Sequence, residues 1–336
     1  MNSGRRAAAL LEVLGVYLAG SLLVGVVVRL LLGFHVPNPL AHFTANISDA
    51  ELLTASRQML VVLILQYAGY FALIVPINWW HRRRGPAAYG LTRGGRSWKA
   101  LLLAGAATAA IASWPVSAVG LANMVWKFGE TVPWRQAFFD TSWARWQFWV
   151  FSAVGSFALV PVLEELFYRG YCQRRLAEDW GDGPAIAGTS CLFVFSHSQY
   201  LIPNAYNVGM VVGLLISAVG LGVVFAWTRS LVPAIFAHAI INVPLRPSWL
   251  SLLLAVFVIG AVLTGSRGAA ATRQVFANAR IVTLLALGLL GAVYGIAAPR
   301  IPALSLAAVG MVLVAVALEA RQKRGERIAK QSAAIA

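Results

Sequence analysis

Charged residues are scarce in this sequence. Only 12% of the 336 residues are Asp, Glu, Lys or Arg, whereas soluble globular domains contain about 25%. Hydrophobic residues make up 59% of the chain, and its mean hydropathy is +0.73. A soluble globular domain needs a more charged surface, and a disordered chain cannot be this apolar, so both classes are excluded. We therefore expect an all-α polytopic membrane protein.

Cysteine is also scarce, which excludes a small secreted module held together by disulfides. The chain contains two cysteines, Cys172 and Cys191, and both fall in apolar sequence. We expect them to be packed thiols.

Acidic residues are also few: the chain has 12 of them and 27 basic residues, which gives a net charge of +15. In a soluble protein this excess would suggest a nucleic-acid partner. Here the basic residues lie between long apolar runs, so we expect no nucleic-acid partner and assign the charge to membrane topology. With a cytoplasmic N-terminus and alternating segments, most Arg and Lys fall on the cytoplasmic side, as the positive-inside rule requires. We therefore expect both termini in the cytoplasm, and the excess of Arg over Lys, 23 to 4, suggests a GC-rich bacterial gene and hence the inner membrane.

About ten hydrophobic segments follow one another along the chain. They lie near residues 9–32, 58–80, 100–122, 147–171, 184–202, 208–227, 231–243, 248–265, 281–298 and 301–319. The seventh is too short to cross a hydrocarbon core of about 30 Å as a straight helix, so we expect it to be buried among the others. The glycine pairs Gly209/Gly213 and Gly291/Gly295 have the spacing that permits close contact between helices.

Ionisable side chains within these segments require an explanation, because each costs at least about 2.5–3.5 kcal/mol at the centre of a bilayer. Glu12 and Arg29 lie toward the ends of the first segment, and we expect both to snorkel to the interface. Away from the segment ends, the acidic residues and histidines within the segments all fall in one third of the chain. They are Glu164 and Glu165 in the fourth segment, His197 in the fifth and His238 in the seventh.

Helical spacing separates the two glutamates. Arg169 follows Glu165 by four residues, so the two share a helix face and can form an ion pair. Glu164 is rotated by about 100° and can face a cavity. Pro161 removes one backbone hydrogen bond a turn earlier. In the seventh segment, His238 and Asn242 are also four residues apart and lie on one face.

One carboxylate, two imidazoles and one amide are suited to hydrolysis of an amide bond by an activated water. The carboxylate, assisted by a histidine, can take a proton from water, and a histidine and an asparagine can donate hydrogen bonds to an oxyanion. Zinc held by Glu164, His197 and His238 is the alternative. The sequence has no His-Glu-x-x-His signature and no visible carboxylate near either histidine, so it favours no cofactor.

Three motifs in order resemble those of the type II CAAX prenyl protease and bacteriocin-processing family of intramembrane proteases. They are Glu164-Glu165-x-x-x-Arg169, Phe193-x-x-x-His197 and His238-x-x-x-Asn242. The resemblance implies a helical-bundle protease core at 147–245, flanked by N-terminal segments at 1–146 and by C-terminal segments with a basic tail at 246–336.

The resemblance also implies the role of each site residue. Glu164 and His197 would activate water, His238 and Asn242 would stabilise the oxyanion, and Glu165 and Arg169 would form a structural pair. The expected substrate is a membrane-bound protein or peptide. Two other functions stay open at this point: a non-catalytic scaffold or peptide-resistance protein of the same fold, and a transporter, which would predict two related halves.

Overall fold

A computed structural model describes residues 3–32, 48–83, 85–126, 146, 151–197, 200–242, 247–297, 310–311, 313–321 and 324–325. Helices account for nearly all of this part of the chain, and it contains no strand. The elements are α1 (Ser3–Leu32), α2 (Asp49–Trp80), η1 (Pro86–Tyr89), α3 (Trp98–Trp126), η2 (Phe151–Leu159), α6 (Val160–Glu165), η3 (Leu166–Gln173), α7 (Arg174–Trp180), α8 (Asp182–Ser196), α9 (Ala205–Thr228), α10 (Val232–Ile241), α11 (Pro247–Phe276) and α12 (Ile281–Ala297).

Among the described residues, five helices are long and apolar enough to cross a membrane. These candidate spans are Ser3–Val27, Leu60–Trp80, Trp98–Asn123, Ala205–Thr228 and Ser251–Phe276, and α10 and α12 are shorter apolar helices. The expected all-α polytopic membrane protein is thus confirmed. The predicted segment at 301–319 lies mostly outside the described residues.

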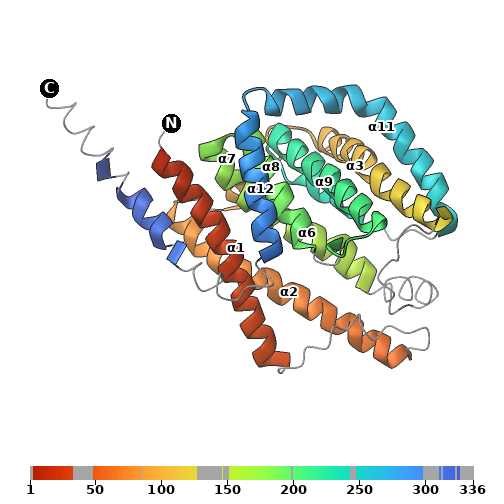
Figure 1. The fold of residues 1–336 in the computed structure, drawn as a ribbon, viewed down its shortest axis with the longest axis horizontal. Coiled ribbons are helices and arrows are strands. Elements are labelled where there is room, and N and C mark those ends of the chain that lie inside the picture. The colour runs from red at the N-terminus through yellow and green to blue at the C-terminus, as the bar shows by residue number, and fades with distance from the viewer. Residues whose placement is uncertain are drawn as a thin grey trace.

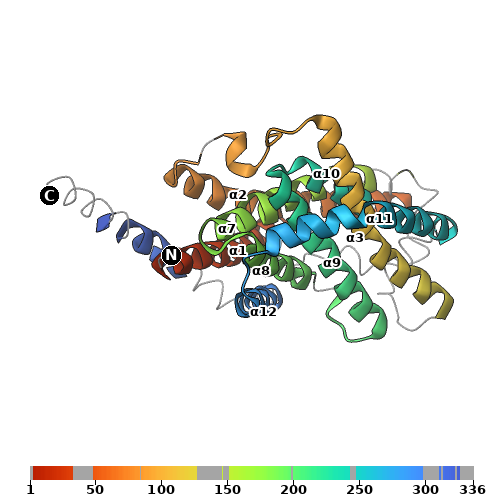
Figure 2. The ribbon, with the colours of Figure 1, turned by 90° about the horizontal axis from the view of Figure 1, so that it is seen from above.

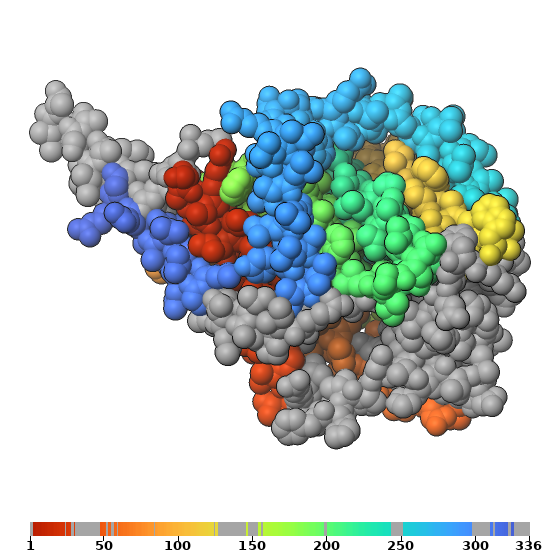
Figure 3. Space-filling model, in the orientation of Figure 1, coloured from red at the N-terminus to blue at the C-terminus, as the bar shows by residue number. Residues whose placement is uncertain are grey.

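The helices pack around α8 and α9, which contact each other (Figure 1). Helix α12 packs along α8, and α3 packs against α9, α10 and α11. Helix α1 contacts α2 and α7, and Figure 2 shows α3 and α11 at the opposite end of the molecule from the N-terminus. On the face shown in Figure 3, α12 lies beside α1.

Glycines allow the closest helix contacts, as their spacing predicted. A Cβ added at Gly291 would lie 2.2 Å from the carbonyl oxygen of Gly188, so only glycine lets α12 approach α8 this closely. A Cβ at Gly213 would lie 2.9 Å from Val116 on α3. Both expected glycine pairs therefore lie at helix interfaces.

The fourth hydrophobic segment is a helix of changing register rather than a uniform α-helix. The π-helical segments η2 and η3 flank the single α-helical stretch α6, in which Pro161 occupies the first turn. A proline here cannot donate a backbone hydrogen bond, and π-helical turns are frequently found at functional sites. The two glutamates of the first motif end this short α-helical stretch.

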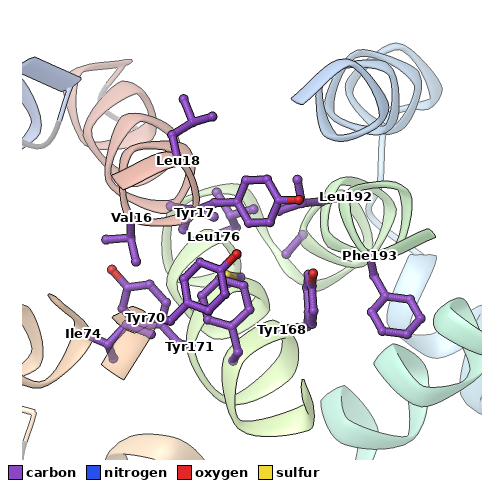
Figure 4. Close-up of a cluster of buried hydrophobic side chains, with 14 of the residues drawn as sticks. Val16, Tyr17, Leu18, Tyr70, Ile74, Tyr168, Tyr171, Leu176, Leu192 and Phe193 are labelled. Atoms are coloured by element: carbon purple, nitrogen blue, oxygen red, sulfur yellow. The ribbon is translucent and has the colours of Figure 1, made fainter. Parts of the chain in front are cut away.

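Aromatic rings fill the core between α1, α2, η3 and α8 (Figure 4). Tyr70 on α2 stacks on Phe167, with ring centroids 4.3 Å apart. Phe167 contacts Tyr168 at 4.9 Å, and Tyr168 contacts Phe193 on α8 at 5.0 Å. This continuous run of packed rings fixes the position of the motif-bearing helix against α2 and α8.

Glu12 does not snorkel, so the expectation for this residue was wrong. It is only 3% exposed, and its carboxylate accepts hydrogen bonds from Tyr171 (3.0 Å) and Arg175 (2.8 Å) and lies 3.0 Å from Nε2 of His81. Glu319 lies 3.0 Å from Nδ1 of the same histidine and accepts a bond from Arg175 at 2.6 Å. Several donors thus compensate the burial of Glu12, while the side chain of Arg29 lies outside the described residues.

Candidate active site

The three motifs come from four elements that meet beside the aromatic core. Helix α6 packs against α10 and continues into η3, which packs against α8. The residues that these elements contribute are Glu164 and Glu165 at the end of α6, Arg169 in η3, His197 at the C-cap of α8, His238 in the last turn of α10, and Asn242 at the C-cap of α10.

Glu165 is fully buried between the side chains of Arg169 and His238. Its Oε1 accepts a hydrogen bond from Arg169 at 3.0 Å and lies 2.7 Å from Nδ1 of His238. Arg169 also donates to the carbonyl oxygen of Ala218 at 3.1 Å and lies 4.9 Å above the ring of Phe193. An arginine this close stabilises the ionised carboxylate, so Nδ1 of His238 is the donor in its contact with Glu165.

This contact determines what the other ring nitrogen of His238 can do. With Nδ1 protonated, Nε2 carries a lone pair when the ring is neutral and a second N–H when the ring is charged. Only the charged form can donate a hydrogen bond to an oxyanion. The neutral form can accept a proton or bind a metal ion.

Glu164 lies at the edge of this buried pair. Its side chain is 13% exposed, and its Oε2 is 3.8 Å from Nε2 of His238. This separation is too long for a direct hydrogen bond and short enough for one water molecule to contact both groups.

His197 is half-buried at the end of α8, where its backbone N–H caps the helix by donating to the carbonyl oxygen of Val194. Its Nδ1 lies 2.7 Å from the carbonyl oxygen of Phe193. Because a carbonyl oxygen only accepts, Nδ1 is the donor and Nε2 is left for other chemistry. The ring of Phe193 contacts both motif histidines, with centroid distances of 4.7 Å to His197 and 6.1 Å to His238.

Asn242 ends α10, and its backbone N–H donates to the carbonyl oxygen of His238 at 3.0 Å. Its side chain is half-buried. His238 and Asn242 therefore lie one helical turn apart at the C-terminal end of α10, as their spacing predicted.

The three candidate zinc ligands do not form a metal site in this arrangement. Among the described residues, the donor atoms of Glu164, His197 and His238 do not all come within 4.8 Å of one another. A group that does so is Glu12, His81 and Glu319, where Arg175 already binds both carboxylates. The buried Glu165 nevertheless supplies His238 with a carboxylate partner, which the sequence did not reveal.

Residues 145–244 match a family model described as type II CAAX prenyl endopeptidase Rce1-like. We refer to residues 145–244 as the Rce1-like region because of this similarity. The matched residues contain all three motifs, and the family resemblance that the motifs suggested is confirmed. The description names an endopeptidase, which is the class of enzyme that the motifs predict. No curated protein and no solved structure matches the chain.

One part of the molecule outside the Rce1-like region reaches the helix that supports this site, and the sequence did not identify it. Glu12 of α1 binds Arg175 in the helix that follows the first motif. A glutamate within the first hydrophobic segment was the available signal for this contact.

Proposed function

We propose that this chain is an intramembrane endopeptidase that hydrolyses a peptide bond of a membrane-associated or lipid-modified substrate. Water activated by Glu164 is the nucleophile. The proposal is supported most directly by the 3.8 Å separation between Oε2 of Glu164 and Nε2 of His238. A water molecule bound there would lie against a base and beside a second polar group.

Glu164 takes a proton from this water as it attacks the carbonyl carbon of the substrate, and the protonated carboxyl group can then pass the proton to the leaving amine. The resemblance pairs Glu164 with His197 in this step, and the 3.8 Å contact adds His238 as a neighbour of the same water. His238 in its charged form and Asn242 stabilise the oxyanion. Glu165 and Arg169 hold His238 in the required orientation.

We favour this metal-free scheme because the three candidate zinc ligands are not assembled. Purified active protein should therefore keep its activity after dialysis against a chelator. Zinc at about one ion per chain, lost together with activity on chelation and restored with it, would contradict the scheme. Zinc-dependent hydrolysis would then replace it.

The substrate class follows from the location of the site. The chain is an integral membrane protein, and the Rce1-like description refers to CAAX prenyl substrates. A lipid-modified or membrane-bound peptide would be held at the membrane that contains the enzyme. With both termini in the cytoplasm, cleavage takes place near the cytoplasmic interface.

The two adjacent glutamates provide a matched pair of isosteric variants. Glu164→Gln keeps the shape of the side chain and cannot act as a base, so processing should stop while the protein stays folded and inserted. Glu165→Gln removes the charge opposite Arg169, so this variant should unfold more readily. Breaking a buried ion pair costs about 3–5 kcal/mol. Because both changes are Glu to Gln, the comparison separates loss of chemistry from loss of stability.

The measurement uses a deletion strain that produces either the wild type or Glu164→Gln. It compares the N- and C-termini of all proteins found in the membranes of the two strains. At least one terminus should form only with the wild type. Thermal unfolding in detergent reports the stability of each variant. If Glu164→Gln generates the same termini at the same rate as the wild type, Glu164 is not the base and the proposal is wrong.

A further inference from the structure

The loop between α2 and α3, residues 85–97, lies outside the Rce1-like region and contacts both chain segments that carry the first and third motifs. The first motif continues from α6 into η3, and the third lies on α10, after the turn that follows α9. Glu165 and His238 lie 2.7 Å apart although 73 residues separate them in the sequence. The fold must therefore hold these two segments at a fixed separation.

The first part of the 85–97 loop packs on η3. A Cβ added at Gly170 would lie 2.8 Å from the carbonyl oxygen of Tyr89, so only glycine lets η3 and the loop approach this closely. Arg174, at the start of α7, donates a hydrogen bond to the carbonyl oxygen of Ala87. Gly170 follows Glu165 by five residues. The loop is thus fastened to the helix just beyond the glutamates of the first motif.

The middle of the loop binds the beginning of α10. The carbonyl oxygen of Gly90 accepts a hydrogen bond of 2.9 Å from the backbone N–H of Leu231, the fully buried N-cap residue of α10. A buried N–H needs such a partner. The Leu231 side chain also packs on η3, since a Cβ at Gly170 would lie 3.1 Å from its Cδ1. Leu231 therefore lies where the loop, η3 and α10 meet, two helical turns before His238.

The last part of the loop binds the end of α9. A Cβ added at Gly94 would lie 2.3 Å from the carbonyl oxygen of Thr228. Arg96 donates to the carbonyl oxygen of Trp227 at 3.1 Å, and its guanidinium lies 4.3 Å from the centroid of the Trp227 ring. One loop is thereby fastened to η3 on one side and to the turn between α9 and α10 on the other.

The separation between α6 and α10 determines the geometry of the site. It sets the contact between Glu165 and His238 and the 3.8 Å distance between Glu164 and His238. Helix α10 has only ten residues, so a displacement of its N-terminal end would carry His238 with it. Small displacements of catalytic groups are costly in rate.

We propose that Gly90 is a positioning residue that ties the N-terminal end of α10 to η3 and so sets the distance between Glu164 and His238. This inference rests on the proposed function of Glu164 as the base. It assigns to a loop of the N-terminal flank a role in catalysis in addition to its role in folding.

The test compares Gly90→Ala with Gly95→Ala. The two glycines have φ angles of +73° and +77°, so alanine strains the backbone to a similar degree at both positions. A Cβ at Gly90 would lie 2.7 Å from the ring of Phe225 and 3.4 Å from Leu231. Apart from its chain neighbours, a Cβ at Gly95 would meet no atom of the described residues within 4 Å. Only Gly90→Ala therefore pushes the loop away from α9 and Leu231.

The first measurement is steady-state kinetics on a fluorogenic peptide that contains the cleavage sequence identified by comparing wild-type with Glu164→Gln membranes. Gly90→Ala should lower kcat by about 10-fold to 100-fold with little change in KM, because the change misplaces groups that act in the chemical step. Gly95→Ala should keep kcat within about twofold. Rates are referred to the folded protein that elutes as a single species in detergent. A lower Tm with an unchanged kcat of the folded Gly90→Ala protein would overturn the proposal.

The second measurement does not rely on activity. Hydrogen exchange at the amide of Leu231 should be faster in Gly90→Ala than in the wild type and unchanged in Gly95→Ala, because this amide is bound by the loop. Equal exchange in all three proteins would overturn the tie between the loop and α10. Full activity of Glu164→Gln would instead overturn the proposed function, and the exchange rates would still report whether the loop holds α10.

A milder variant decides the question if Gly90→Ala does not fold. Arg96→Ala removes the contact with Trp227, and Arg93→Ala, which changes an exposed arginine of the same loop, is its control. Arg96→Ala should lower kcat by about threefold to tenfold and speed exchange at Leu231, while Arg93→Ala should change neither. Equal kcat and equal exchange in these two variants would overturn the proposal.

Discussion

His238 lies between two carboxylates whose roles differ because their surroundings differ. Glu165 is fully buried and bound by Arg169, so it serves as a fixed acceptor for Nδ1 of His238. Glu164 is partly exposed and lies on the other side of the ring. In the mechanism that we propose, Nε2 of His238 and the Glu164 carboxylate are the two groups that contact the nucleophilic water. Under this proposal, the buried pair of Glu165 and Arg169 supports a reactive group that is not itself part of the pair.

The amide of Asn242 should act only in the transition state. Asn242→Ala should lower kcat by about 10²–10³-fold, because one donor to the oxyanion is lost. Its KM should stay nearly unchanged, since the negative charge on oxygen exists only in the transition state. Steady-state kinetics measures both values on a fluorogenic peptide that contains the cleavage sequence identified by comparing wild-type with Glu164→Gln membranes.

Asn207 provides the control for Asn242. Its buried amide donates to the carbonyl oxygen of Ile202 at 2.8 Å, and Ile202 belongs to none of the three motifs. Asn207→Ala should lower Tm and leave kcat of the folded protein unchanged. If both variants lose kcat equally, Asn242 has a structural role and the assignment to the oxyanion is wrong.

Local spacing predicted some of the site contacts, and long-range packing determined the others. The Glu165–Arg169 pair is a contact between residues four apart in the sequence, so the helical repeat was enough to suggest it. The contact between Glu165 and His238 joins residues 73 apart. It depends on how α6 packs against α10, which hydrophobic periodicity does not specify.

At the scale of helices, the order and type of the hydrophobic segments could be predicted, and their ends and internal register could not. The fifth segment was expected at 184–202, and α8 ends at Ser196 with His197 as its cap. The fourth was expected to end at residue 171, and its helix continues through η3 and α7 to Trp180. The polar face of that extension, which includes Arg175, is buried against α1. A hydropathy pattern cannot anticipate a buried polar face.

An ion network joins four helical segments. It consists of Glu12 of α1, His81 at the end of α2, Arg175 of α7 and Glu319 in the helical residues 313–321. His81 lies just beyond the end of α2. Burial alone disfavours its charged form, but the Glu12 and Glu319 carboxylates beside its two ring nitrogens outweigh this and raise the pKa of His81 above its usual value near 6.5. The charged imidazole therefore links two carboxylates from opposite ends of the chain.

This link predicts a pH-dependent stability. Because the pKa of His81 is raised in the folded state, its contribution is fully present below the unfolded pKa of about 6.5 and is lost as pH rises through the folded pKa. Each unit of the pKa difference corresponds to about 1.4 kcal/mol. The Tm of the wild type should thus fall as the pH is raised above about 6.5.

The variant His81→Gln removes the titrating group and keeps a side chain that can donate one hydrogen bond. Its Tm should be lower than that of the wild type at pH 6, and the difference should shrink as pH rises. Thermal unfolding of the two proteins across this range is the measurement. A difference in Tm that stays constant with pH would show that the imidazole is not charged in the folded protein.

At the scale of the whole molecule, the Rce1-like region is enclosed by helices from both flanks. Helix α3 from the N-terminal side packs on α9 and α10, while α12 from the C-terminal side packs on α8. Helices α1 and α2 contribute to the aromatic core beside the first motif. The predicted divisions at 1–146, 147–245 and 246–336 are therefore stretches of sequence whose helices pack against one another in the folded protein. We expect the region at 145–244 to need its flanking helices for folding.

The orientation of the molecule determines which side of the membrane supplies the substrate. Basic residues are concentrated in the segments that follow α2 and α11 and in the C-terminal tail, so these should be cytoplasmic. Reporter fusions placed after Arg84 and after Arg273 should indicate the cytoplasm, and a fusion near Trp134 should indicate the exterior; Arg84 and Trp134 lie outside the described residues. Paired reporters, one active only inside and one only outside, give a positive signal in either case. Because the loop after α2 contacts η3 through Tyr89 and Gly170, an exterior signal after Arg84 would place the first motif near the opposite face and would contradict cleavage at the cytoplasmic interface.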